Sequence, residues 1–171
     1  MIYPIVLFGD PVLERESEKV TQFDTPELNQ LLDDMFESMY AARGVGLAAP
    51  QIGVAKRISV IDLSVGNDPE QKLVLINPEI IGREGMLAGE EGCLSLPGFR
   101  EQVSRPTKVT VRAQDAKGAT FEKTGEALLA RAFLHETDHL HGRLYIHHVS
   151  ALKRDLIRRK VKKLVKAGEW S

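Results

Sequence analysis

The chain has 171 residues, of which 43% are hydrophobic and 27% are charged, and its formal net charge is -1. This size and composition are typical of one globular domain, so we expect residues 1–171 to form a single unit. Near-neutrality gives no reason to expect that the whole surface attracts nucleic acid or a membrane. The single cysteine excludes an intrachain disulfide, and the sequence carries no evident signal peptide or membrane span. We therefore expect a cytoplasmic protein.

The N-terminal part of the chain predicts an extended arm followed by an amphipathic helix. Residues 1–24 form the arm, with a turn at Gly9-Asp10-Pro11. Thr25-Pro26-Glu27 opens the helix with a capping residue, a first-turn proline and an acid at the positive end of the helix dipole. We expect the helix to end near Arg43-Gly44. Its apolar stripe faces the core and consists of Leu28, Leu31, Leu32, Met35, Phe36 and Met39.

A stretch dense in small residues, Gly44-Val45-Gly46-Leu47-Ala48-Ala49-Pro50-Gln51, follows this helix. Small residues let the backbone approach a ligand or another chain closely. A phosphate-binding loop is disfavoured, because no Gly-Lys-Ser/Thr follows and Ala49 occupies the place of the last glycine of GxGxxG. Gln51 offers a side-chain amide at the edge of this loop, although the same residue also suits an ordinary turn.

Several short apolar runs predict strands. Leu73–Ile76 is apolar throughout, which indicates a strand buried on both faces that ends at Asn77-Pro78. Further strands are expected at residues 58–63, from Ile80-Ile81, at residues 109–113, and from Phe121 after a turn at residues 115–118.

Two histidines stand four residues apart in the segment Glu126 to His141, with a glutamate directly after the first. The segment is rich in alanine and leucine, which predicts a buried central helix closed by Gly142. On a helix, His135 and His139 project from one face and can reach one metal ion, while Glu136 can act on a water there as general base. The five-residue HExxH pattern also occurs in ordinary helices, so a third ligand has to be sought.

Three candidates for the third ligand emerge from the sequence. Glu169 is a poor one, because it lies near the end of the chain after a basic region. The HExxHxxGxxH pattern is weakened, since Tyr145 stands where the last histidine belongs. Cys93 remains, although a lone cysteine is more often a small buried hydrophobic residue than a ligand. Its value rises because a catalytic metal usually takes three protein ligands.

Three stretches together resemble the bacterial type of the polypeptide deformylase family, the peptide deformylases. They are Gly44–Gln51, Glu91-Gly92-Cys93-Leu94-Ser95 and His135-Glu136-Thr137-Asp138-His139, in the family's order. The resemblance covers nearly the whole chain. It implies an α+β fold in which antiparallel β-sheets surround a central HExxH helix, with an N-terminal helix and a C-terminal helix packed outside.

The same resemblance implies an enzyme that hydrolyses the N-formyl group from the N-terminal formylmethionine of newly synthesised polypeptides and releases formate. Its substrates would be N-formylmethionyl peptides, and the chain would be a monomer. Fe²⁺ would be the resident metal, with Zn²⁺, Ni²⁺ or Co²⁺ as substitutes. The implied ligands are Cys93, His135 and His139, and Glu136 is the general base. The implied donors to the oxyanion are the Gln51 side chain and the Leu94 N–H. Glu91, Arg105 and Asp138 are implied to orient the ligands. The implied substrate-binding residues are Gly44, Val45, Gly46, Arg100, Leu128, Arg131 and Ala132.

Three positions depart from the family's pattern. Thr137 stands where an apolar residue is usual, Leu134 where glutamine is frequent, and Gly89 where a larger apolar pocket residue is expected. We expect these departures to change the shape of the pocket rather than the reaction. A metallopeptidase acting on ordinary peptide bonds and a protein with a purely structural metal stay open as alternatives.

The last segment predicts a helix at residues 151–166, preceded by Ser150. Its apolar stripe is Leu152, Leu156, Val161, Leu164 and Val165. Its other face is basic and consists of Lys153, Arg154, Arg158, Arg159, Lys160, Lys162, Lys163 and Lys166. A solvated surface is the ordinary explanation of such a face. The resemblance suggests instead that this helix contacts ribosomal RNA.

Overall fold

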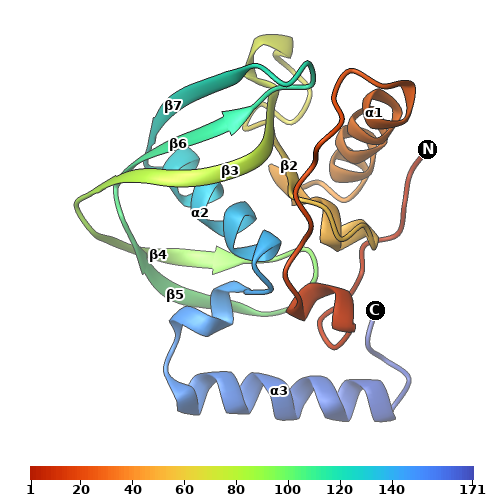
Figure 1. Cartoon of the computed structure of the whole chain (residues 1–171). Helices are drawn as coiled ribbons and strands as arrows, with labels where there is room; N and C mark the ends of the chain where they lie inside the picture. The colour runs from red at the N-terminus through yellow and green to blue at the C-terminus, as the bar shows by residue number, and fades with distance from the viewer.

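A five-stranded antiparallel sheet and a two-stranded hairpin enclose one helix in the computed structural model, which describes residues 1–171 (Figure 1). The sheet order is β1-β2-β3-β6-β7, and the hairpin is β4-β5. The strands are β1 Gly46–Ala48, β2 Ile58–Ile61, β3 Leu73–Glu84, β4 Leu87–Gly92, β5 Arg100–Arg105, β6 Lys108–Gln114 and β7 Thr120–Glu126. The helices are α1 Pro26–Ala41, α2 Leu128–Leu140 and α3 Ala151–Lys166. The predicted α+β class, with antiparallel sheets around the HExxH helix, is confirmed.

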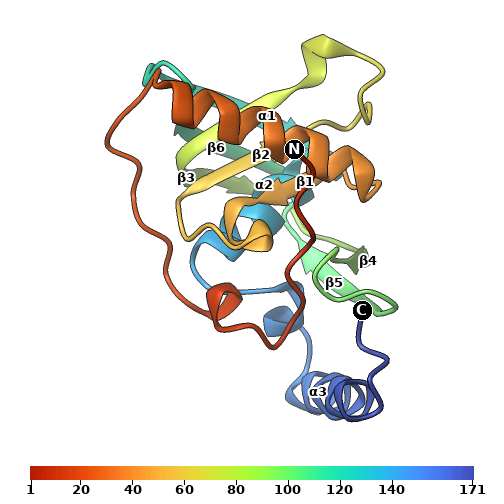
Figure 2. The same cartoon turned by 90° about the vertical axis from the view of Figure 1, so that its right-hand side faces the viewer.

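Helices α1 and α2 pack on different parts of the sheet (Figures 1 and 2). Helix α1 covers β1 and β2, and its Met35 and Met39 are completely buried in one cluster with Leu47. Helix α2 lies between the sheet and the hairpin, and its Phe133 is buried in a second cluster with Val111. Apolar burial on this scale holds α2 in place from several sides.

The ends of α1 and α2 follow the predicted capping signals. The Thr25 hydroxyl accepts a hydrogen bond from the Leu28 N–H at 3.1 Å, and Pro26 is the first residue of α1. Helix α2 ends at Leu140, and Gly142 takes a φ of +75° just beyond it. A Cβ at Gly142 would stand 2.7 Å from the Glu14 backbone, so glycine is needed there both for conformation and for space.

The prediction that a strand ends at Asn77-Pro78 is wrong, because β3 continues through both residues to Glu84. The pairing of β3 with β6 shifts between Ile76 and Glu79, which is a β-bulge. Asn77 adopts a φ of +52°, and its side-chain amide bonds to the Val20 backbone in both directions at 2.9 Å. Proline is tolerated at a bulge because its missing N–H is not needed for the ladder there.

Three other features of the secondary structure differ from the prediction. Helix α2 begins at Leu128 rather than Glu126, because Gly125 and Glu126 still pair with β6 and Ala127 turns the chain with a φ of +52°. The hairpin β4-β5 was not expected, since β4 has few apolar residues to show an alternating pattern. The expected loop of small residues contains a short strand, β1, that pairs with β2.

Helix α3 begins after Ser150, whose hydroxyl caps the Lys153 N–H at 3.2 Å. The predicted apolar stripe is only partly right. Ile157 and Val161 are the buried residues of α3, whereas Leu152, Leu156 and Val165 are exposed. The helix lies outside the two sheets (Figures 1 and 2) and therefore buries a narrow strip rather than a broad face. None of the helices combines the length and the apolar character that crossing a bilayer requires.

A buried carboxylate fixes the chain between β2 and the loop of small residues. Asp62 is fully buried directly after β2, and its backbone N–H donates to the Val45 carbonyl at 2.8 Å. Its carboxylate accepts hydrogen bonds from the Tyr40 hydroxyl, from the N–H and hydroxyl of Ser64, and from the Gly66 N–H. Burial opposes ionisation, but these donors lower the pKa of Asp62 below its ordinary value of 3.8.

Replacing Asp62 by asparagine should destabilise the fold in a pH-dependent way. At neutral pH the substitution replaces one carboxylate oxygen, so a buried donor to Asp62 is left without its acceptor. This costs roughly 1–3 kcal/mol of stability. Because the folded pKa is lowered, the carboxylate's contribution is complete above pH 3.8 and disappears as the pH falls through the folded pKa. In urea denaturation, the free energy of unfolding should therefore be lower for Asp62→Asn than for wild type at neutral pH, and this difference should narrow well below pH 3.8. A difference that is absent or independent of pH would contradict this account.

Candidate metal centre

Three potential metal ligands converge from two parts of the chain. Cys93 follows β4 directly, and His135 and His139 lie one turn apart on α2. Their ligand atoms all lie within 4.8 Å of one another, and the Cys93 Sγ is 3.3 Å from the His139 Nε2. No fourth histidine, cysteine or acid joins this group. Three protein ligands with room for a further one are typical of a catalytic metal site rather than a closed structural one.

A buried carboxylate orients the first histidine. Glu91 is 4% exposed, and its Oε2 lies 2.8 Å from the His135 Nδ1, so that the Nε2 is left for a metal. The same carboxylate accepts two hydrogen bonds from Arg105, at 2.8 and 3.1 Å, and one from Arg131 at 2.9 Å. Arg105 in turn reaches Asp138 at 2.9 Å. Of the three side chains expected to orient the ligands, only Glu91 contacts one. Arg105 bonds to Glu91 and Asp138, and Asp138 bonds to Arg105 and His148.

The electrostatics of the cluster suit a divalent cation. Burial by itself would raise the pKa of the Cys93 thiol, but the neighbouring His139 and His135 lower that pKa to about 5. Burial likewise opposes a charged His135, yet the Glu136 charge and the hydrogen bonds with Cys93 and Glu91 raise its pKa well above the usual value. A thiolate and two carboxylates thus surround the imidazoles with negative charge, which a bound cation would neutralise.

Glu136 lies beside the cluster with part of its carboxylate unused. The residue is 3% exposed, its Oε1 is buried without a hydrogen-bond partner, and burial raises its pKa. A Cβ at Gly46 would stand 2.6 Å from the Glu136 Oε2. Glycine in the small-residue stretch therefore gives this carboxylate its space. An orphaned buried oxygen next to three ligand atoms fits a water or substrate group held in the same site.

Gln51 and Leu94 also lie at the cluster. The Gln51 Oε1 accepts from the Ala48 N–H at 3.0 Å, which fixes the side-chain amide. The Gln51 Nε2 donates to the Ser95 hydroxyl at 3.1 Å and lies 3.6 Å from the Cys93 Sγ. The Leu94 N–H donates to no acceptor of the protein. The Leu94 N–H is thus a free donor beside the ligands, and the Gln51 amide is a donor that already points at Ser95 and the Cys93 sulfur.

A cleft of about 490 Å³ opens over this cluster. Its apolar wall includes Leu128, which is 54% exposed at the mouth rather than buried as expected from the helix pattern. Arg100 also lines the cleft and forms an exposed ion pair with Glu90 at 3.1 Å. The structure brings all the predicted substrate-binding residues to this cleft, namely Gly44, Val45, Gly46, Arg100, Leu128, Arg131 and Ala132.

The position of Arg131 explains the departure at Gly89. A Cβ at Gly89 would stand 2.8 Å from the Arg131 Nη2, so the guanidinium occupies the space of the expected larger residue. Arg131 is held there by the carbonyls of Leu87 and Val103, at 3.1 and 3.0 Å, and by Glu91. Its charge is therefore already neutralised, and the cleft keeps a fixed wall at this position.

Two neighbours of the site, Tyr145 and Ser95, were not predicted to have a role there. Tyr145 was considered only as a failed ligand, but it is completely buried and its ring stacks on His135 with centroids 6.5 Å apart. Ser95 is completely buried and holds the Gln51 amide. Ser95 could have been found from its place in the Glu91–Ser95 motif. No pattern in the sequence indicates that Tyr145 stacks on a histidine.

Comparisons with known proteins identify the family. The family model described as polypeptide deformylase matches residues 2–155. The chain belongs to this family. The peptide deformylase of Acidobacterium capsulatum is 61% identical over 170 residues, covering 99% of this chain and 99% of that protein. The crystal structure of a peptide deformylase from Legionella pneumophila has a TM-score of 0.90 at 46% identity and covers 100% of this chain and 99% of that chain. The crystal structure of peptide deformylase from Thermus thermophilus has a TM-score of 0.88 at 41% identity, with 97% of each chain covered.

Membership of the polypeptide deformylase family decides between the alternatives left open by the sequence. It assigns the chain to metal-dependent hydrolases that act on the formyl amide bond, rather than to peptidases of ordinary peptide bonds. The three-ligand cluster agrees with that assignment better than with a purely structural metal, because a structural site is usually closed by a fourth protein ligand.

Proposed function

We propose that the chain removes the N-formyl group from the N-terminal formylmethionine of newly synthesised polypeptides and that the residues around Cys93 carry out this hydrolysis. One observation above all supports the assignment of the site. The ligand atoms of Cys93, His135 and His139 lie within 4.8 Å of one another in a chain of the deformylase family, with Glu136 beside them. The products are formate and a polypeptide with a free amino terminus.

Cys93, His135 and His139 would hold one divalent cation. Such a cation supplies Lewis-acid chemistry, which lowers the pKa of a water and polarises a carbonyl oxygen. A thiolate and two imidazoles suit several metals of the first transition row, so the donor set alone does not choose among them. We take Fe²⁺ as the resident metal, as family resemblance implies, with Zn²⁺, Ni²⁺ and Co²⁺ as substitutes.

Glu136 moves the proton. Its carboxylate takes a proton from the attacking water and delivers it to the amine that leaves when the formyl C–N bond breaks. Burial raises the pKa of Glu136, which makes its carboxylate a better base than one in water. Gly46 leaves room for the carboxylate at the position where it works.

Gln51 and Leu94 would stabilise the negative charge that develops on the formyl oxygen. The Gln51 amide is held by Ala48 and Ser95, so its donors do not reorganise during the reaction. The free N–H of Leu94 supplies a second donor. Removing one donor of this kind typically costs about 2.7–4 kcal/mol of transition-state stabilisation.

The rest of the cleft would bind the N-formylmethionyl peptide. Leu128 and Ala132 offer apolar surface for the methionine side chain. Gly44, Val45 and Gly46 let the backbone of the substrate lie close to the enzyme. Arg131 fixes one wall through Glu91, and Arg100 is the exposed cation at the entrance. Since newly made chains emerge in the cytoplasm, we place the activity there. We expect the protein to act as a monomer.

Replacing Glu136 by glutamine should abolish turnover and leave metal binding intact, because the amide cannot accept a proton but fills the same space. The measurement is formate release from an N-formylmethionyl peptide by anaerobically Fe²⁺-loaded protein, together with metal content. Glu122→Gln, an exposed carboxylate on β7 that does not line the cleft, is the control and should retain activity. Substantial turnover in Glu136→Gln would remove Glu136 from its role.

We also propose that α3 contacts ribosomal RNA through its basic face, at residues that are mostly exposed. Each phosphate neutralised by a lysine or arginine releases counterions, so this contact should weaken as salt rises. Arg158→Glu/Lys162→Glu should reduce co-sedimentation with ribosomes and leave hydrolysis of a short formylated peptide unchanged. Lys117→Glu/Lys123→Glu, exposed in the turn between β6 and β7 and on β7, is the charge-matched control. Equal co-sedimentation of both variants would contradict the role of α3.

A further inference from the structure

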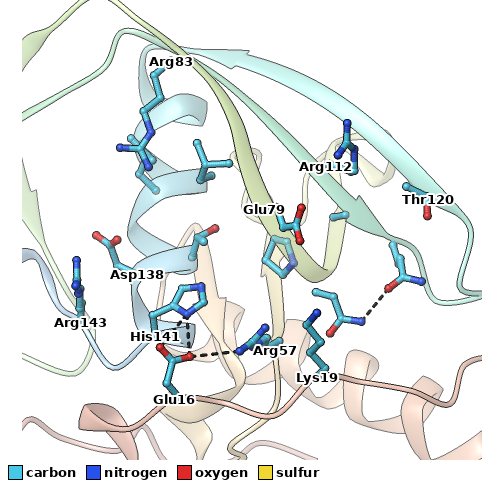
Figure 3. Close-up of a pocket in the computed structure, with 17 residues that line it drawn as sticks. Glu16, Lys19, Arg57, Glu79, Arg83, Arg112, Thr120, Asp138, His141 and Arg143 are labelled. Carbon is cyan, nitrogen blue, oxygen red and sulfur yellow. Dashed lines mark hydrogen bonds and ion pairs between the residues drawn. The ribbon is translucent and has the colours of Figure 1, made fainter.

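A second cavity, of about 770 Å³, lies behind the helix that carries the histidines (Figure 3). Helix α2 contributes Leu134, Thr137 and Asp138 to it, which share one face because they are three or four residues apart, and His141 follows directly after the helix. His135, Glu136 and His139 project from another face of α2. No residue that lines this cavity also lines the cleft over the metal site. The two spaces are therefore separate.

The walls of the rear cavity are polar and carry many cations. They come from the N-terminal arm, from β3 around its bulge, from β6 and from the turn after α2. None of the lining residues is phenylalanine, tyrosine or tryptophan. Its lining cations, several of them labelled in Figure 3, are Lys19, Arg57, Arg83, Arg112 and Arg143, against the acids Glu16, Glu79 and Asp138.

Two of the three acids are already neutralised by protein groups. Glu16 lies 3.4 Å from Arg57 and 2.9 Å from His141. Asp138 is held by Arg105 and His148, both at 2.9 Å and neither a lining residue.

The third acid, Glu79, stands opposite Arg112 in the pairing of β3 with β6 but forms no ion pair, because Arg112 pairs with Glu122 on β7 at 3.7 Å. Lys19, Arg83 and Arg143 are left without an ion-pair partner in the protein. These three cations are exposed to solvent and outnumber Glu79, the one lining acid without an ion pair, so the cavity holds an excess of positive charge.

A buried hydroxyl at the α2 wall is also without a partner. Thr137 is 7% exposed, and its Oγ1 makes no hydrogen bond. Buried polar atoms are nearly always paired, so an orphaned one that borders a polar cavity indicates a missing water or ligand group. Nothing in the metal site uses this hydroxyl, because Thr137 belongs to the opposite face of α2.

We propose that the rear cavity binds a compact polyvalent oxyanion, a molecule that carries several phosphate or carboxylate groups. Guanidinium forks match the planar or tetrahedral oxygens of both groups. The volume lies within the range of about 300–1,000 Å³ that small-molecule sites occupy. The lack of an aromatic platform disfavours a nucleobase or single-stranded RNA, which would stack on one. Because the cleft is separate, the anion and a formylated peptide can be bound together.

The test is isothermal titration calorimetry of the metal-loaded protein with inorganic tripolyphosphate, with citrate and with inorganic phosphate. We expect saturable one-to-one binding, weaker for inorganic phosphate. Arg83→Ala/Arg143→Ala removes two uncompensated cations and should lower the affinity at least about tenfold. Lys162→Ala/Lys163→Ala removes the same amount of charge from α3, away from the cavity, and should change the affinity for the anion less than about threefold. Retained formate release by the Arg83→Ala/Arg143→Ala variant shows that it is folded.

The outcomes separate the sources of the anion and the ways in which the proposal fails. If the binding of both tripolyphosphate and citrate depends on Arg83 and Arg143, the cavity is a general oxyanion site. If the binding of only one of them does, that anion identifies phosphate or carboxylate as the group that is recognised. Both anions also chelate metals, so metal content is measured after each titration. Binding that is unchanged in Arg83→Ala/Arg143→Ala comes from chelation or another surface and overturns the proposal. The proposal is also overturned if both double variants lose the same amount of anion affinity, or if the wild-type protein shows no saturable binding.

Discussion

The Glu91 carboxylate joins the parts of the fold that make the site. It is buried between β4 and α2, where it bonds to Arg105, Arg131 and His135. Burial alone would raise its pKa, but the hydrogen bonds from His135 and Arg105 lower that pKa far below the usual range. The group therefore stays ionised, and removing Arg105, its equally buried partner with two hydrogen bonds, should cost about 3–5 kcal/mol. The hairpin, the helix and the metal ligands thus depend on one another.

This arrangement explains why the site needs two sheets. Helix α2 presents both histidines from one element, and the hairpin supplies Cys93 from the other side. The five-stranded sheet brings Gly46 and the Gln51 segment to Glu136, where the glycine's missing Cβ lets the carboxylate approach. Each functional group is held by an element that is itself packed in the core, so little ordering remains to be done when substrate binds. The opposite face of α2 is left free to border the rear cavity.

The sequence predicted the features that depend on local chemistry. The cap at Thr25, the stripe of α1 and the spacing of His135 and His139 were visible because each rests on residues close together in the chain. The bulge at Asn77 was missed because its cause is a contact with Val20, far away in sequence. The place of Arg131 over Gly89 and of Tyr145 against His135 are likewise products of tertiary packing. The grouping of Cys93 with the histidines needed the family resemblance, since spacing alone left other third ligands open.

The Glu91 network positions the His135 imidazole beside the other two ligands, so metal affinity should depend on it. The most direct test is the Zn²⁺ dissociation constant of Glu91→Gln, measured by competition with a chelator and compared with wild type and with Glu90→Gln. The account predicts a weakening of about 10–100-fold in Glu91→Gln, as is typical when the group that orients a ligating histidine is removed, and no change in Glu90→Gln. A folded Glu91→Gln variant, verified by circular dichroism, that binds Zn²⁺ as tightly as wild type would contradict it.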